Sequence, residues 1–173
     1  MSAIIERVYA DGGVCLKNPS PIGGSWAWLQ VAHDEVLREA SGHVTPGQAG
    51  FPGGTVSNNF TELLAAVLAL EALPDGWCGT LYTDSQVTLY RLTGSRKFGG
   101  IPEPLRRRCQ AQLARVGFVR VVLLGGHPSR KDLAAGYRRD GLPVSKFNVR
   151  ADELCGLRAR ELAASLQPAG GAP

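Results

Sequence analysis

Apolar runs separated by clusters of Gly, Pro and Asn divide the chain into predicted strands and helices. Runs rich in β-branched and aromatic residues predict five strands, at residues 4–10, 25–31, 35–41, 80–83 and 118–124. The first run has few polar positions and ends in Val-Tyr-Ala, so we expect a central strand. The first three strands should form an antiparallel meander. A long loop without apolar periodicity should follow them at residues 42–57.

Helical periodicity predicts four helices, at residues 57–73, 86–92, 103–116 and 148–166. The helix at 57–73 is apolar nearly all round, so it must lie buried against the sheet, and it stops before Pro74. A right-handed crossover through this helix places the strand at 80–83 parallel to the first strand. Residues 129–147 should form a basic connection, and the tail at 167–173 should be flexible.

This order of elements indicates an α/β domain of three layers, in which helices flank a five-stranded mixed sheet. The 173 residues suffice for one domain, residues 1–166, whose core needs no disulfide or structural metal. The four cysteines form no Cys-x-x-Cys pair, which argues against a zinc or redox motif. No leader or membrane-spanning run is evident, and scattered thiols suit a reducing compartment. We therefore expect a cytoplasmic protein that is a monomer.

Acidic residues follow two of the predicted strands. Asp11 comes at the end of the first strand and Asp84 at the end of the fourth. Parallel strands end at the same edge of a sheet, so these two carboxylates should lie close together. Taken alone, Asp11 fits an Asp-Gly turn, Glu62 fits stabilisation of the first helical turn, and Asp84 fits a helix cap.

Four segments resemble the four acidic motifs of type 1 ribonuclease H, in the same chain order. They are Tyr-Ala-Asp-Gly-Gly at 9–13, Ser-Asn-Asn-Phe-Thr-Glu-Leu at 57–63, Leu-Tyr-Thr-Asp-Ser-Gln at 81–86 and Asn-Val-Arg-Ala-Asp-Glu-Leu at 148–154. One motif is weak, but four in order make a specific signal, and the match spans residues 8–162. The resemblance implies a ribonuclease H-like three-layer fold. It also implies an endoribonuclease that hydrolyses the RNA strand of RNA–DNA hybrids and leaves a 5′-phosphate and a 3′-hydroxyl.

The resemblance assigns roles to the acids. Asp11 would bridge two metal ions, and Asp152 would complete the site that activates the attacking water. Glu62 and Asp84 would hold the ion beside the leaving 3′ oxygen. Two carboxylates about 4 Å apart repel by roughly 4 kcal/mol at an effective dielectric of about 20, and a divalent cation removes that penalty. Oxygen ligands favour Mg²⁺, with Mn²⁺ as the substitute, over zinc.

Other residues acquire roles by the same resemblance. His127 resembles the loop histidine that assists proton transfer or product release. Four polar residues match positions that contact the minor groove of the hybrid, namely Asn18, Asn58, Asn59 and Gln86. Such contacts read shape and 2′-hydroxyl groups instead of sequence. Cys15 lies near another such position, and Asn58 and Asn59 also suit helix capping.

Some bacterial enzymes of this family carry a Trp-rich basic handle. The corresponding segment of this chain, residues 85–117, is shorter than theirs and contains no Trp. The net charge of +4 and the isoelectric point near 9.1 fit a polyanionic partner without requiring one. Other basic surfaces must then bind the hybrid. The candidates are Arg106, Arg107 and Arg108 and, in the connection, Arg130, Lys131, Arg138 and Arg139. The alternative for the connection is a solvated charged loop.

Two other functions stay open at this point. One is a non-catalytic domain that binds hybrids on the same fold, which the retention of all four carboxylates disfavours. The other is a related two-metal nuclease that acts on DNA, such as a junction resolvase or a transposase-like domain. The Asn58-Asn59 pair and Gln86 favour the ribonuclease.

Overall fold

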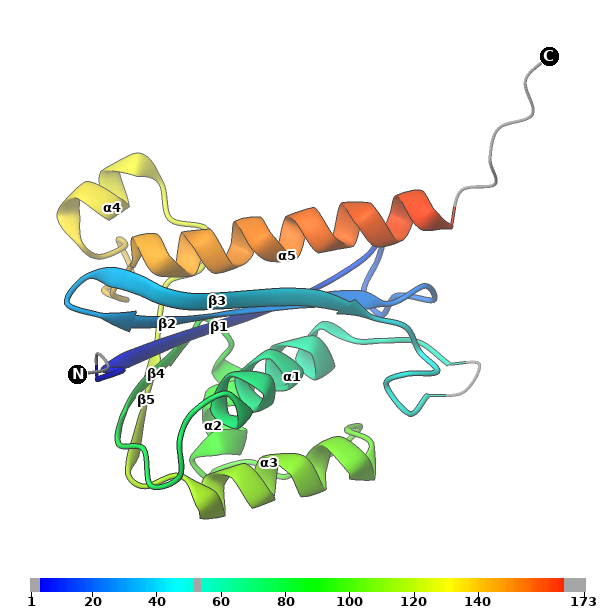
Figure 1. Cartoon of the computed structure of the whole chain (residues 1–173). Coiled ribbons are helices and arrows are strands. Elements are labelled where there is room, and N and C mark those ends of the chain that lie inside the picture. The colour runs from blue at the N-terminus through cyan, green and yellow to red at the C-terminus, as the bar shows by residue number, and fades with distance from the viewer. Residues whose placement is uncertain (1–3, 52–53, 167–173) are drawn as a thin grey trace.

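The computed structural model describes residues 4–51 and 54–166 (Figure 1). The strands are β1 (Arg7–Val14), β2 (Gly24–Ala32), β3 (Glu35–Val44), β4 (Gly79–Thr83) and β5 (Val119–Leu123). They form one sheet in the order β3-β2-β1-β4-β5, with β1 in the centre. β1, β2 and β3 pair antiparallel, whereas β4 is parallel to both β1 and β5. The predicted five-stranded mixed sheet is therefore confirmed.

The helices cover both faces of this sheet. They are α1 (Asn58–Glu71), α2 (Gln86–Leu92), α3 (Glu103–Arg115), α4 (Arg130–Ala135) and α5 (Lys146–Ser165). α1, α2 and α3 lie on one side of the sheet and α5 on the other, which gives the three predicted layers (Figure 1). Within residues 4–51 and 54–166, no helix is both long and apolar enough to cross a bilayer.

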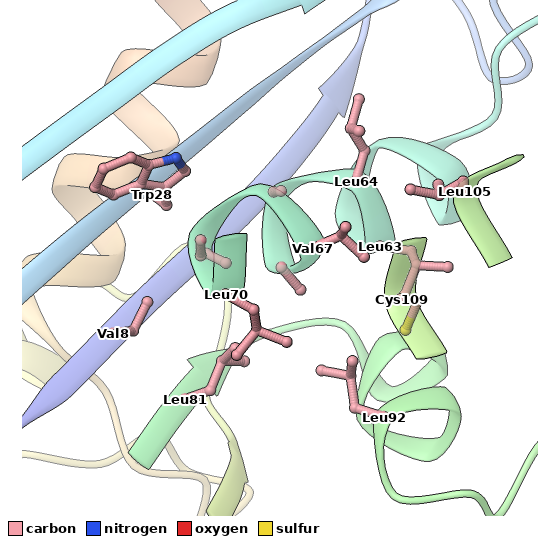
Figure 2. Packing of buried hydrophobic residues seen from close by; sticks show 14 of the residues in the cluster. Val8, Trp28, Leu63, Leu64, Val67, Leu70, Leu81, Leu92, Leu105 and Cys109 are labelled. Carbon is pink, nitrogen blue, oxygen red and sulfur yellow. The ribbon is translucent and has the colours of Figure 1, made fainter. Parts of the chain in front are cut away.

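The larger hydrophobic core lies between α1 and the sheet. Val8 of β1 and Leu81 of β4 pack with Leu70 of α1, and all three side chains are fully buried (Figure 2). Leu105 and Cys109 of α3 belong to the same cluster and cover the other side of α1 (Figure 2). α1 is apolar nearly all round because both its sides are covered, as its sequence predicted.

A smaller core on the opposite face fixes the start of α5. The rings of Tyr9 in β1 and Tyr82 in β4 stack with their centroids 4.7 Å apart, and Phe147 of α5 packs 5.2 Å from Tyr9. Ala151 and Leu154 continue this contact along α5. The first turns of α5 therefore lie over β1 and β4, near the ends of the two parallel strands.

Several strand boundaries differ from the prediction, and β1 begins at Arg7 instead of Ile4. β1 was expected to end at Ala10, with Gly12 and Gly13 bending the chain away, but it continues to Val14. Both glycines stay in the ladder because the long partner β2 pairs with them, through Trp26 and Ser25. The predicted loop at 42–57 is also too long, since β3 extends to Val44 along the same partner strand.

The basic connection also differs from the prediction. Residues 130–135 form the short helix α4, which the sequence analysis missed, and α5 begins two residues earlier than expected. The signal for α4 is local: Ser129 and Asp132 form a capping box with reciprocal hydrogen bonds. The tail at 167–173, predicted to be flexible, lies outside the described residues.

Gly12 allows α1 to approach β1. A Cβ atom on Gly12 would overlap backbone atoms of Thr61 and Glu62, whereas one on Gly13 would meet only the Ser25 hydroxyl oxygen at 3.3 Å. We expect Gly12→Ala to lower the free energy of unfolding by about 1–3 kcal/mol, because backbone must move apart. Urea denaturation measures this, with Gly13→Ala as the matched control. Equal effects of the two substitutions would contradict the close-approach argument.

Candidate active site

The register of the parallel strands brings Asp11 and Asp84 together. Tyr9 of β1 pairs with Tyr82 of β4, and each aspartate follows its tyrosine by two residues. Side chains two residues apart in an extended chain lie on the same face, so both carboxylates extend from equivalent positions. Oxygen atoms of Asp11, Glu62 and Asp84 all lie within 4.8 Å of one another. The expected proximity of Asp11 and Asp84 is therefore observed, and Glu62 joins them, whereas Asp152 is not part of this group in the described chain.

Glu62 reaches the group from the second turn of α1, so its expected place in the first turn is wrong. Ser57 is the N-cap of α1 and accepts a hydrogen bond from the Phe60 amide, which leaves Asn58 and Asn59 inside the helix. Asn58 Nδ2 donates to Glu62 Oε1 at 3.2 Å. The buried Glu62 Oε2 has no hydrogen-bond partner among the described residues. The buried position of Glu62 therefore fits a metal ligand better than a charge that stabilises the start of the helix.

Asp84 does not cap a helix either. Ser85 is the N-cap of α2 and accepts a hydrogen bond from the Thr88 amide. The Asp84 carboxylate instead accepts a hydrogen bond from Asn148 Nδ2, at 3.2 Å from Oδ2. Asp84 is therefore held toward the acids and toward α5.

The three acids are electrostatically strained. Burial and then the charges of Asp84 and Asp152 raise the pKa of Asp11 well above its ordinary value, although the Gly12 amide donates to it at 2.9 Å. Burial, followed by repulsion from Asp11 and Asp84, likewise raises the pKa of Glu62 well above its ordinary value. Burial raises the pKa of Asp84, against the opposing hydrogen bond from Asn148. A positive charge at this place would relieve all three groups.

Asp152 and His127 lie at the rim of this group. Asp152 is half-exposed on α5 and is not among the three acids that converge within 4.8 Å in the described chain. Its Oδ2 atom lies 3.7 Å from Nδ1 of His127, whose side chain is exposed. His127 has a φ of +47°, in the left-handed region that few residues other than glycine adopt. The loop thus presents the imidazole beside the fourth predicted acid.

All four predicted acids and His127 line one pocket of about 430 Å³. The remaining lining residues are Gly12, Gly13, Asn58, Gly126 and Arg138. Asn58 is the only one of the four predicted minor-groove residues on this wall, within the described part of the chain. Asn18 lies next to it, because its Oδ1 accepts a hydrogen bond from the Asn58 amide at 3.0 Å.

The other predicted binding residues lie farther out. Asn59 and Gln86 are exposed, and Gln86 Nε2 donates to the Tyr90 hydroxyl. Arg130 and Lys131 are exposed on α4 and do not line the pocket that the described residues form. Cys15 is buried and its thiol donates to the Ala159 carbonyl at 3.5 Å, so its side chain faces α5, and its nearness to a substrate-contacting position stays a prediction.

One residue of the site was missed by the sequence analysis as a candidate, and a second was named only as one of several basic residues. Asn148 is buried beside Asp84, and its spacing of four residues before Asp152 on one helix was the available signal. Arg138 lines the pocket from the basic connection, and its guanidinium donates to the Gly126 carbonyl at 2.9 Å. No local pattern distinguishes Arg138 from the other basic residues around it.

These features fit a hard divalent cation. The donors are carboxylate oxygens, one of them is buried without a partner in the described chain, and burial disfavours their charged forms. Mg²⁺ and Mn²⁺ prefer oxygen ligands, whereas zinc prefers nitrogen and sulfur. Asp11, Glu62 and Asp84 are thus the residues that would hold such an ion.

Solved structures with the same architecture were found by comparison. The N-terminal ribonuclease H domain of a Mycobacterium tuberculosis protein superposes with a TM-score of 0.60 and 19% identity, over 92% of this chain and 98% of that domain. Ribonuclease H1 of the archaeon Halobacterium salinarum gives 0.59 and 22%, over 90% of this chain and 97% of its own. The fold is that of ribonuclease H.

Two curated ribonucleases H match part of the chain in sequence. The ribonuclease H of Oleidesulfovibrio alaskensis is 43% identical over 79 residues, which are 46% of this chain and 43% of that protein. The match to the enzyme of Nitratidesulfovibrio vulgaris is 41% over 86 residues, 50% of this chain and 47% of that protein. The ribonuclease H-like chain therefore aligns with about half the length of these curated relatives. No family model matches its sequence.

Proposed function

We propose that this chain is an endoribonuclease that hydrolyses the RNA strand of RNA–DNA hybrids and leaves a 5′-phosphate and a 3′-hydroxyl. The observation that carries the proposal is the convergence of Asp11, Glu62 and Asp84 within 4.8 Å, on a ribonuclease H fold. The relatives named ribonuclease H support it over the aligned half of the chain. In this proposal the chain acts as a cytoplasmic monomer and uses two Mg²⁺ ions, which Mn²⁺ can replace.

The acids have distinct places in the proposed reaction. Asp11 is the most central, since Asp84 and Asp152 both act on its charge. Asp11, Glu62, Asp84 and Asp152 would together hold the two ions, and Asp152 lies at the open rim. The ions would supply Lewis-acid stabilisation of the charge that develops on the phosphate. The protein supplies three converging carboxylates, two of them buried, and a fourth at the rim of the same pocket.

His127 is proposed to move a proton at the rim of the pocket. Its exposed imidazole lies beside Asp152, with 3.7 Å between Nδ1 and Oδ2, and both side chains can reach solvent. In this role His127 would deliver a proton to the departing 3′ oxygen and recover one from water. An exposed position also suits product release.

Asn58 and Asn18 are proposed to orient the hybrid across the pocket. Asn58 lines the wall next to the acids and already donates to Glu62 Oε1. Asn18 is tied to the same helix end through the Asn58 amide. Amide groups of this kind hydrogen-bond to base edges and 2′-hydroxyl groups, which distinguishes an RNA strand from DNA. Asn59 and Gln86 extend the proposed contact beyond the pocket, on exposed surface.

The decisive experiment compares substrates and metals. End-labelled RNA–DNA hybrid, duplex DNA and duplex RNA are incubated with the chain in Mg²⁺, in Mn²⁺ and in EDTA. Cleavage of the hybrid alone, lost in EDTA, is the expected result. Cleavage of duplex DNA would instead support the two-metal DNA nuclease, and hybrid binding without any cleavage would support the non-catalytic domain.

Asn148→Ala is expected to lower hybrid cleavage about 10- to 100-fold, because Asn148 orients a proposed metal ligand. In the wild type, the hydrogen bond from Asn148 Nδ2 lowers the pKa of Asp84, so loss of this bond in the variant raises the pKa of Asp84 further. Asp84 then becomes deprotonated only at higher pH, and the acidic limb of the pH–rate profile moves to higher pH. Rates measured across pH test this, with the exposed amide variant Gln110→Ala as control. An unshifted profile would contradict the positioning role.

A further inference from the structure

Arg138 occupies an unusual place for a basic side chain. It is the one Lys or Arg among the described residues that line the acidic pocket, where it shares the wall with Gly126 and His127. Its stem packs against Gly125, since a Cβ atom on that glycine would overlap Arg138 Cδ. Its guanidinium donates to the Gly126 carbonyl at 2.9 Å. The side chain is therefore seated against the loop that carries His127.

The backbone around Arg138 is also held in place. Arg138 N donates to the Leu142 carbonyl at 2.9 Å, and Gly141 N donates back to the Arg138 carbonyl at 2.9 Å. This turn is tied to the end of the sheet through a 2.8 Å hydrogen bond from Gly125 N to the Pro143 carbonyl. These hydrogen bonds thus fix the backbone that carries Arg138.

The charge of Arg138 is not used by the acids of the pocket. Among the described residues its ion pair is with Asp140, at 3.0 Å, and none joins it to the four pocket acids. Both partners of this pair are more than a third exposed, so the pair contributes little. The guanidinium keeps hydrogen-bond donors for another anion, and its planar fork matches the geometry of a phosphate.

We propose that Arg138 binds a backbone phosphate of the strand being cut, next to the scissile phosphate on the side where His127 lies. This inference rests on the proposed function and names a residue that positions its substrate. In the basic connection, only Arg138 would then make a defined contact with the substrate. Arg130, Lys131 and Arg139 are exposed and would attract the substrate only through their positive charge. Arg138 in this way provides a phosphate contact in a chain without a Trp-rich handle.

The first test measures hybrid binding in EDTA across salt concentrations, together with kcat and KM in Mg²⁺. Arg138→Ala should weaken binding and raise KM about 10- to 100-fold, with kcat at saturation nearly unchanged. The slope of log Kd against log salt should fall by about 1. Arg138→Lys should restore the slope and part of the affinity. Arg139→Ala should weaken binding much less, and Arg120→Ala, an exposed charge on β5, should change nothing.

A second measurement locates the contact. Neutral methylphosphonate groups replace single phosphates of the RNA strand near the cut. The substitution that removes the contact should weaken binding of the wild-type chain as much as Arg138→Ala does, and should have no further effect on that variant. If Arg138→Ala does not fold, the same series with the wild-type chain and Arg138→Lys decides the question.

The outcomes separate the two proposals. Unchanged Kd, KM and salt slope in Arg138→Ala, with hybrid cleavage by the wild type, overturn the inference and leave the function standing. A fall in kcat alone also overturns it, because it indicates an effect on chemistry and not on substrate binding. Absent wild-type cleavage overturns the function, while weakened hybrid binding by Arg138→Ala in EDTA still supports the phosphate contact.

Discussion

Asp84→Asn is expected to reduce cleavage of the hybrid at least about a thousandfold while leaving hybrid binding in EDTA within about twofold. Asp84 is one of three acids whose oxygens converge within 4.8 Å, and an amide cannot replace the charge that a cation needs. Loss of several kcal/mol of electrostatic stabilisation of the transition state corresponds to such a factor. Single-turnover cleavage and binding isotherms measure the two quantities.

The control for this prediction removes the same charge elsewhere. Asp75→Asn alters an exposed carboxylate that pairs with Arg115 at the surface, so cleavage should be unchanged. Asp84→Asn is nearly isosteric and should fold. Retained cleavage in that variant would remove Asp84 from the metal site and would weaken the proposed function itself.

Asp11→Asn is expected to stabilise the chain in EDTA at pH 7.5 by about 1–4 kcal/mol, because it removes a buried charge that two other acids repel. The pKa of Asp11 is raised in the folded state, so the folded chain holds this proton more tightly than the unfolded chain. Stability without metal therefore falls as the pH rises from the ordinary value of 3.8 through the folded pKa. The variant should lose part of this pH dependence, and Glu62 should account for the rest.

Mg²⁺ should remove most or all of the stability difference between the two proteins. An ion that binds only the folded state adds about 2.7 kcal/mol at a hundred times its dissociation constant, and the variant should gain much less. Urea denaturation from pH 5 to 8, with EDTA or with Mg²⁺, measures both effects, and Asp75→Asn serves again as the surface control. A wild-type chain that is equally stable with and without Mg²⁺, or a destabilised Asp11→Asn, would contradict the strained acidic site.

Much of the fold could be predicted because it depends on neighbouring residues. The apolar character of α1 indicates a helix covered on both sides, and the run at 80–83 indicates a buried strand. The right-handed crossover then makes β4 parallel to β1, which brings the residues after both strands to one edge. The proximity of Asp11 and Asp84 therefore followed from pattern and chain order, before any coordinate was known.

The errors lie where long-range pairing decides the outcome. β1 continues through Asp11 because β2 offers partners as far as Gly24, and residues 7–14 alone do not contain that information. The close approach of α1 to β1 at Gly12 contributes to the burial of Glu62 among the acids, and the N-cap at Ser57 places Glu62 in the second turn. Cys15 is buried for the same kind of reason, through its contact with α5.

The sequence by itself thus determined the order of the elements and the mixed sheet, since these follow from local periodicity and chain connectivity. The four acids were named from the resemblance of their motifs to those of ribonuclease H. Only the tertiary structure decided which acids are buried together, that Asp152 stays at the rim, that Asn148 lies against Asp84, and that Arg138 lines the pocket. Burial, pKa shifts and side-chain contacts depend on atoms that are distant in the chain. Their positions are fixed only when strands and helices pack.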